Sequence, residues 1–253
     1  MKIRNMELGQ GVPKVCIPLT SRSPEELRSD CENLRSLPFD MMEWRIDCLL
    51  GMEGFDPQET LQKGFTVLRT YFPDTVLLAT VRTQPQGGAF PIRQDAYWAL
   101  LREILEIGKA DILDIEYGHA VMATVRLLSL AKSKHIPVLT SFHRFSGPMK
   151  EEELLTCYDR MKEIGGDILK IAVLPQTPLD LCALLRAAAL TGKKYPDTPV
   201  IAIGMGRLGM LTRLAGNSLG APLTFASARE ASAPGQLSAE DAGHILDCLY
   251  KEP

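Results

Sequence analysis

Residues 167–173 read Asp-Ile-Leu-Lys-Ile-Ala-Val, and this stretch indicates both a fold class and a site of chemistry. Its aliphatic residues, with two glycines before them and Pro175 after them, predict a β-strand that is buried on both faces. Lys170 stands in the middle of that strand. Burial penalises the charged form of an amine, so we expect Lys170 to have a lowered pKa and to act as a nucleophile toward carbonyl carbons. Taken alone, a structural lysine that is ion-paired within the core is an equal alternative.

Segments with strand character and segments with helical character alternate eight times along the 253 residues. Ser23 before Pro24, for example, is a helix-start signal. This alternation predicts an α/β protein with a single (β/α)8 TIM barrel over residues 1–253, and a turn at residues 9–11 suggests a short N-terminal hairpin before it. The predicted strands are residues 14–20, 41–47, 76–82, 112–117, 137–143, 167–173, 199–205 and 223–227, and the predicted helices include 93–108, 120–134, 150–164, 177–190 and 238–250.

Composition favours a small-molecule enzyme over a protein that binds nucleic acid or a membrane. The net charge is -3 and the basic residues are scattered, so no nucleic-acid partner is expected. No apolar stretch is long enough for a membrane span and the amino terminus lacks an apolar signal region, so we expect a cytoplasmic protein. The six cysteines are widely spaced without a CxxC pair, which favours reduced thiols over disulfides or a metal site.

Alternate residues of each predicted strand share one face, and one face collects the polar residues. A barrel interior is filled mainly by Val, Ile and Leu, so inward cations, carboxylates and a histidine call for a functional explanation. Most of them lie toward the carboxyl ends of the strands, where barrel enzymes place their active sites. Asp47 and Asp114 have an alternative role as buried partners that orient an arginine or the histidine. The inward set is Glu43, Arg45, Asp47, Arg82, Asp114, Glu116, His143 and Lys170.

His143 ends the strand that precedes the strand of Lys170, so the two side chains are expected to be neighbours inside the barrel. Imidazole exchanges protons near neutral pH, which makes a general acid/base role for His143 the better interpretation beside an inward lysine. The arginines favour a substrate with hydroxyls and a carboxylate. The residues alone therefore predict a class I aldolase-like, Schiff-base enzyme that acts on a carbonyl compound with several oxygens.

Several ordered stretches closely resemble the type I 3-dehydroquinase family. They are GMGRLGMLTR at 204–213, LTF at 223–225, ASAPGQL at 231–237, EWRID at 43–47, the glycine pair at 87–88, SFH at 141–143 and DILKIAV at 167–173. The resemblance implies a (β/α)8 barrel that dehydrates 3-dehydroquinate to 3-dehydroshikimate in aromatic amino-acid biosynthesis. It also implies a homodimer and the use of no metal or organic cofactor.

The resemblance assigns the chemical steps to three residues. Lys170 matches the lysine that condenses with the substrate ketone, forming an iminium that acidifies the neighbouring carbon. His143 matches the residue that removes that proton and then protonates the departing hydroxyl. Arg213 matches the arginine that binds the substrate carboxylate, and its role depends on the family motif alone.

The resemblance also implies residues that bind the substrate and shape the site. Glu43, Arg45 and Arg82 match residues around the hydroxyls and the lysine, and Ser21 lies at a substrate-facing position after the first strand. Ser232 and Gln236 match a mobile loop that closes over the substrate. The supporting residues are Gln86 and Asp114 with the apolar walls Met205 and Phe225.

Two positions depart from the family pattern. Gln86 stands where a glutamate that assists the histidine is common, and Arg144 follows His143 where aspartate is usual. These changes predict an altered rate and pH optimum, and they leave a catalytically weakened paralogue as an alternative. Another Schiff-base barrel lyase, such as an aldolase, and a non-catalytic barrel that binds a quinate-like ligand are further alternatives.

Overall fold

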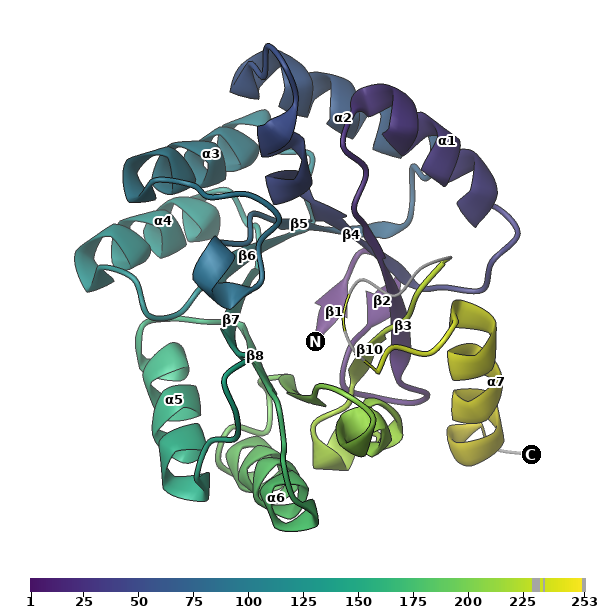
Figure 1. Cartoon of the computed structure of the whole chain (residues 1–253), viewed down its shortest axis with the longest axis vertical. Coiled ribbons are helices and arrows are strands. Elements are labelled where there is room, and N and C mark those ends of the chain that lie inside the picture. Colours follow the sequence, from purple (N-terminus) through teal and green to yellow (C-terminus); the bar gives the residue numbers. More distant parts are fainter. Residues whose placement is uncertain (229–232, 234, 252–253) are drawn as a thin grey trace.

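Eight parallel strands curl into a nearly closed barrel in the computed structural model, which describes residues 1–228, 233 and 235–251. The strand order is β10-β3-β4-β5-β6-β7-β8-β9, so consecutive strands are neighbours (Figure 1). The fold is therefore the (β/α)8 TIM barrel that the alternation predicts. The strands are β3 (Lys14–Leu19), β4 (Met41–Arg45), β5 (Val76–Thr80), β6 (Ile112–Glu116), β7 (Val138–Arg144), β8 (Ile168–Val173), β9 (Val200–Gly204) and β10 (Leu223–Phe225).

Helices surround the barrel and cover its outer face (Figure 1). The Ser23 side chain accepts a hydrogen bond from the backbone N–H of Glu26 at 3.1 Å, as its position before Pro24 predicts. Between β9 and β10 the chain forms two 3-10 helices, η3 (Leu208–Leu214) and η4 (Asn217–Leu219). The α-helices are α1 (Pro24–Leu34), α2 (Pro57–Tyr71), α3 (Gln94–Ile107), α4 (Val121–Ser133), α5 (Glu151–Glu163), α6 (Pro178–Lys194) and α7 (Ala239–Tyr250). None of the helices in the described part of the chain is long and apolar enough to cross a membrane.

An N-terminal hairpin is present, but the prediction of its turn is wrong. Strand β1 (Lys2–Ile3) pairs antiparallel with β2 (Met6–Glu7), so the turn lies at Arg4 and Asn5 and not at residues 9–11. Arg4 has a positive φ of 50°, and its guanidinium donates to the Asp111 carboxylate at 2.5 Å. This long-range contact holds a turn that the local sequence does not signal. The glycines at 9 and 11 lie in the bend that leads into β3.

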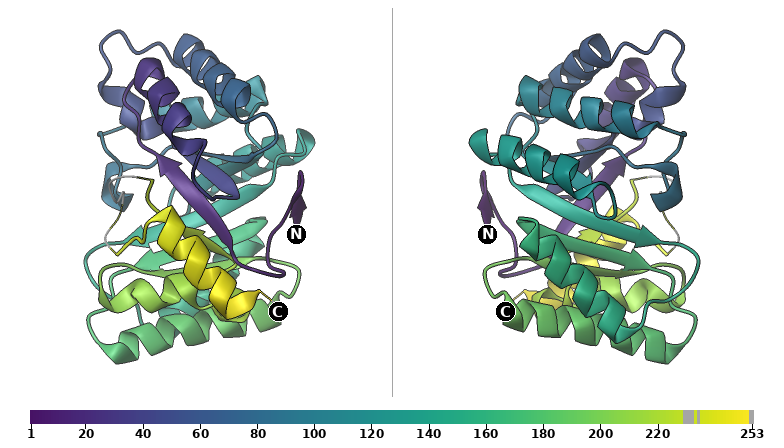
Figure 2. Two further views of the ribbon diagram at one scale, coloured as in Figure 1. Left: turned by 90° about the vertical axis from the view of Figure 1, so that its right-hand side faces the viewer. Right: turned by 90° about the vertical axis from the view of Figure 1, so that its left-hand side faces the viewer.

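The hairpin covers the end of the barrel at which the strands begin (Figure 2). Ile3, Met6 and Leu8 are buried in one cluster with the first inward residues of several strands, including Met41 and Val76. This apolar floor lies at the opposite end from the polar residues at the strand termini. Burial of three apolar side chains at about 1.5–3 kcal/mol each holds the hairpin in place.

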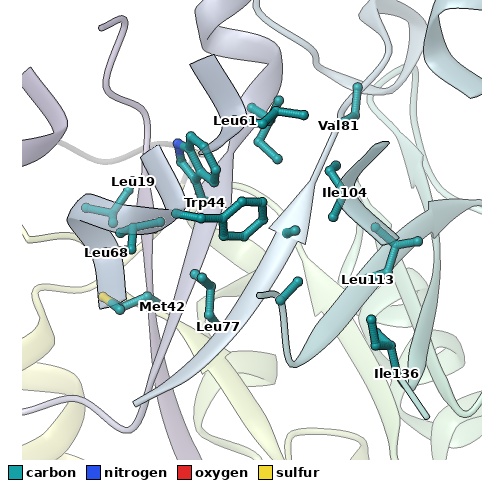
Figure 3. Packing of buried hydrophobic residues seen from close by; sticks show 14 of the residues in the cluster. Leu19, Met42, Trp44, Leu61, Leu68, Leu77, Val81, Ile104, Leu113 and Ile136 are labelled. Atoms are coloured by element: carbon teal, nitrogen blue, oxygen red, sulfur yellow. The ribbon is translucent and has the colours of Figure 1, made fainter. Parts of the chain in front are cut away.

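The second core layer lies between the barrel and its helices (Figure 3). Trp44 of β4 packs edge-to-face on Phe65 of α2 with ring centroids 4.9 Å apart. Leu169 and Ile171 of β8 pack in a cluster with residues of α5 and α6, whereas Ile168 lies in the cluster inside the barrel. The alternation places Lys170 on the inner face, as strand parity predicts.

Candidate active site

A cavity of about 160 Å³ opens inside the barrel at the carboxyl ends of the strands. The side chains that reach it come from β4, β7, β8, β9 and β10 and from the loops after the strands. A parallel barrel brings these strand ends to one rim, which is why residues far apart in the sequence meet here. The described lining residues are Glu43, Arg45, Arg82, Gln86, Gly87, His143, Phe145, Lys170, Ala172, Ile203, Met205, Arg213, Phe225, Ala233 and Gln236.

Lys170 projects from β8 into this cavity and is only 4% exposed. Its Nζ lies 3.8 Å from the centroid of the Phe225 ring. Burial lowers the pKa of Lys170 below its usual value; the Arg82 cation adds to this effect, and Glu43 and Asp114 oppose it. A larger fraction of this amine is neutral at physiological pH than in an exposed lysine, which is what nucleophilic attack on a carbonyl requires.

His143 lies on β7 beside β8, where it pairs with Ala172, while Ser141 pairs with Lys170. Burial holds the pKa of His143 well below its usual value, and the nearby cations of Arg82, Lys170 and Arg45 lower it further. The imidazole is therefore neutral at physiological pH. A neutral imidazole beside a nucleophilic amine can accept a proton from a carbon next to an imine.

Arg82 is held by carboxylates beneath the cavity. Its guanidinium donates to Asp114 at 2.6 Å, to Glu116 at 3.1 Å and to the Ser141 hydroxyl at 2.7 Å. Although burial disfavours the charged form, these carboxylates and Glu43 raise the pKa of Arg82 above its usual value. Arg82 thus presents a fixed positive charge to the cavity.

Arg45 is fixed by a two-bond contact with Asp47, with both nitrogen–oxygen distances at 2.8 Å. Asp47 also accepts the backbone N–H groups of Arg82 and Ala89, which ties the segment after β5 to the end of β4. The structure thus gives Asp47 and Asp114 the role of buried partners that orient arginines. Strands β4 and β5 each end two residues earlier than predicted, at Arg45 and at Thr80. Beyond these points such side-chain contacts replace the hydrogen bonds between neighbouring strands.

The oxygen and the nitrogen of the Gln86 side-chain amide each make a hydrogen bond to a backbone group. Its Oε1 accepts the backbone N–H of His143 at 2.8 Å, and its Nε2 donates to the Tyr117 carbonyl at 3.1 Å. The side chain therefore links the segment after β6 to the strand that carries His143. Arg144 points away from the cavity, with a guanidinium nitrogen 3.6 Å from the Glu153 carboxylate of α5.

Arg213 reaches the cavity from η3 and is only 3% exposed. Its Nη1 donates to the Phe225 carbonyl at 3.3 Å, and burial lowers its pKa to about 10, which leaves it charged at neutral pH. The Gly204–Gly209 contact makes this placement possible, because a Cβ on Gly209 would lie 2.1 Å from the Gly204 carbonyl carbon. The short helix therefore packs directly on the end of β9.

The remaining predicted residues occupy different surroundings. Met205, Phe225 and Gln236 line the cavity, and Asp114 lies beneath Arg82. Ser21 is not among the described lining residues, since it is 1% exposed and its hydroxyl donates to Asp30 at 2.7 Å. Ser232 lies outside the residues that the structure describes.

Phe145 lines the cavity and was not predicted from the sequence. Its ring lies over Gly87 so closely that a Cβ there would stand 2.6 Å from the ring. A signal for it was available, because residues 141, 143 and 145 share one strand parity. Ile203, Ala172 and Ala233 also line the cavity and carry no polar signal that sequence reasoning could use.

Comparison with known proteins identifies a family for nearly the whole chain. The family model described as type I 3-dehydroquinase matches residues 15–253. The 3-dehydroquinate dehydratase of Alkaliphilus oremlandii is 34% identical over 251 residues, which cover 99% of this chain and 97% of the relative. That of Syntrophotalea carbinolica is 35% identical over 252 residues, covering 100% and 98%.

Solved structures of similar proteins share the whole fold. A crystal structure of type I 3-dehydroquinate dehydratase from Clostridium difficile with covalently modified comenic acid has a TM-score of 0.93 at 33% identity, covering 99% of this chain and 98% of that one. The 3-dehydroquinate dehydratase of Geobacillus kaustophilus has a TM-score of 0.90 at 29% identity, with coverages of 98% and 95%. The chain therefore belongs to the type I 3-dehydroquinase family and is a hydro-lyase of that family.

Proposed function

We propose that the protein dehydrates 3-dehydroquinate to 3-dehydroshikimate, a step of aromatic amino-acid biosynthesis, through an imine with Lys170. The observation that carries the proposal is the buried amine of Lys170, with its lowered pKa, in one cavity with His143. Family membership supports the substrate, because the similar curated proteins are named for it. Their names say nothing of the residues involved.

In the proposed reaction, the neutral Lys170 amine attacks the ketone carbon and water leaves, giving an iminium. The positive nitrogen draws electrons from the adjacent carbon, so His143 can remove a proton from it and an enamine forms. The enamine electrons then expel the hydroxyl two carbons from the imine, which departs as water with the proton that His143 returns. Hydrolysis of the imine releases the product and restores both residues.

The cavity's charges support a binding role for several further residues. Arg213 is proposed to bind the substrate carboxylate, and Glu43, Arg45 and Arg82 to hold its hydroxyls. Met205 and Phe225 form apolar walls, and Gln236 with Ser232 belongs to the proposed closing loop. Ser21 is retained as a substrate contact only if it rotates away from Asp30. Asp114 and Gln86 support Arg82 and His143 in this scheme.

Imine chemistry and proton transfer by imidazole supply every step, so the proposal requires no metal or organic cofactor. A cytoplasmic homodimer without a nucleic-acid partner completes the proposal, and light scattering on the purified protein tests the dimer.

Trapping with borohydride tests the covalent step. Protein treated with 3-dehydroquinate and sodium borohydride is expected to gain the mass of one reduced adduct, and Lys170→Ala is expected to gain none. Lys193→Ala, which removes an exposed lysine of α6, serves as the control and should be labelled like the unmodified protein. Labelling of Lys170→Ala, or no labelling of the unmodified protein, would rule out the proposed intermediate.

A steady-state assay of 3-dehydroshikimate absorbance separates an active dehydratase from a weakened paralogue. We expect His143→Ala to lower kcat by about 10²–10⁴-fold, the usual contribution of a general acid/base, while adduct trapping persists. Full activity of His143→Ala would exclude the histidine from proton transfer.

A further inference from the structure

We infer that the aromatic face of Phe225 is a catalytic group that stabilises the positively charged forms of the Lys170 nitrogen, both the ammonium and the iminium. The iminium part of this inference depends on the proposed function, whereas the ammonium part can be tested on the protein alone. A role as an apolar wall would require only the shape of the ring.

The geometry places the amine on the ring face. The Nζ–centroid distance of 3.8 Å is well within the range of a cation–π contact. Phe225 and Lys170 are each 4% exposed, so water competes little for either. Desolvation is the condition under which the attraction of a cation to an aromatic quadrupole is strongest.

The ring is also the nearest stabilising partner of the amine. Within the described part of the chain, Nζ makes no hydrogen bond or ion pair. Glu43 is the carboxylate with the largest effect on it, but one Glu43 oxygen already accepts the Thr80 hydroxyl at 2.8 Å. A buried ammonium without an ion pair needs another source of stabilisation, and the Phe225 face is positioned to supply it.

Phe225 is held firmly in this position. It is the last residue of β10, it pairs with Cys16 of β3, and its carbonyl accepts Arg213 Nη1. The backbone at both sides of the ring is thus fixed by the barrel and by η3. The distance between ring and amine is therefore a property of the scaffold.

Several titratable groups face the amine from the other strands and must be held constant in any test. Glu43 approaches from β4 and Asp114 from β6, and both favour the ammonium. Arg82, after β5, disfavours it, and the buried Cys16 thiol lies on β3. His143 on β7 shares the cavity. None of these groups changes when the electron density of the ring alone is altered.

Fluorination withdraws electron density from the ring while almost preserving its shape, so it isolates the electrostatic contribution. Phenylalanine at 225 is replaced site-specifically by 4-fluoro-, 3,5-difluoro- and pentafluorophenylalanine. In the unliganded protein, the Lys170 pKa is followed by the NMR shift of labelled lysine Cε, assigned with Lys170→Met. We expect the pKa to fall stepwise, by about one pH unit over the series, because the ammonium loses its partner.

The pH dependence of kcat/KM tests the iminium. At low pH the free enzyme carries the Lys170 ammonium, and the reaction converts this cation into the iminium, which is also a cation. Fluorination weakens the attraction of the ring to both cations equally, so kcat/KM should be the same for all variants. At high pH the free enzyme carries the neutral amine, so fluorination destabilises only the iminium. The high-pH plateau of kcat/KM should therefore fall about tenfold over the series. The acid limb of the profile, which reports the Lys170 pKa, should move to lower pH by about one unit. A steric effect would instead lower the rate equally at every pH.

Pentafluorophenylalanine at position 65 is the matched control. Phe65 of α2 is also buried, but it packs on Trp44 between the barrel and the helices. Its fluorination should change neither the Lys170 pKa nor the pH profile. A Lys170 pKa that stays constant along the series at 225, or a uniform loss of rate at all pH values, would overturn the inference. If the unmodified protein does not turn over 3-dehydroquinate, the proposed function fails while the pKa series still decides the contact with the ammonium.

Discussion

At the scale of single residues, the burial that lowers the pKa of Lys170 also costs folding free energy. Its pKa is lower in the folded protein than the usual 10.5. Between those two pKa values the unfolded chain binds more protons, so this group makes stability rise with pH up to about 10.5. We expect Lys170→Met to raise the free energy of unfolding at pH 7 and to raise it less at pH 10.

Urea unfolding at the two pH values measures this difference. Lys193→Met serves as the control, because it removes an exposed lysine of α6 that does not line the cavity. A gain from Lys170→Met that is equal at pH 7 and pH 10 would contradict the assignment, since improved apolar packing alone does not depend on pH.

The Gln86 amide predicts a shifted pH profile when its charge is changed. Glutamate at this position would place a carboxylate within contact of the His143 backbone and lose the donor to the Tyr117 carbonyl. Gln86→Glu is expected to raise the pKa of His143 from its depressed value. The limb of the pH profile of kcat that reports the protonation of His143 should therefore move to higher pH by about one unit or more. Gln86→Met, which is uncharged, should leave the limb in place, and identical profiles for the two variants would show that charge at position 86 does not reach the histidine.

At the scale of elements, the N-terminal hairpin is expected to contribute to stability through its apolar face. Met6 is 6% exposed and packs in the cluster inside the barrel, whereas Glu7 of the same strand is exposed. Met6→Ala should lower the free energy of unfolding by about 2–5 kcal/mol, and Glu7→Ala should stay within about 0.5 kcal/mol. Chemical denaturation measures both, and equal midpoints would mean that the hairpin is not part of the cooperative fold.

The elements could be predicted from the sequence where the cause of structure is local. Strand β8 and the start of α1 follow from aliphatic runs and from the Ser23–Pro24 signal. The early end of β4 could not be predicted, because Asp47 bonds to backbone groups that come more than 30 residues later. The hairpin turn depends likewise on the distant Asp111.

At the scale of the whole molecule, the inward-facing polar residues could be predicted, because side chains along each barrel strand alternate between the interior and the helices. Strand position alone predicts that Lys170, His143 and Arg82 face the interior, and all three line the cavity. Arg213 could not be, since its burial depends on the packing of η3 against β9, and only the family motif pointed to it. Ser21 shows the reverse case, in which a position suggested by the family turns toward a helix residue in this structure.

The distribution of charge predicts a salt-dependent encounter with an anionic substrate. The chain has a net charge of -3, yet four cations and one carboxylate line the described part of the cavity. The Debye length shortens from about 30 Å at 0.01 M salt to about 8 Å at 0.15 M, so steering toward these cations weakens. We expect kcat/KM for 3-dehydroquinate to fall severalfold over this range while kcat changes little, and stopped-flow or initial-rate assays at the two salt concentrations check it. An unchanged kcat/KM would mean that encounter is not rate-determining.

The apolar floor formed by Ile3, Met6 and Leu8 turns the barrel into a dead-end chamber. In the proposed reaction, substrate and product then enter and leave only at the carboxyl ends of the strands, and an intermediate bound to Lys170 blocks that opening until the imine is hydrolysed. On this proposal, the closed end of the barrel keeps the water released by elimination near the imine, whose hydrolysis consumes one water in the last step.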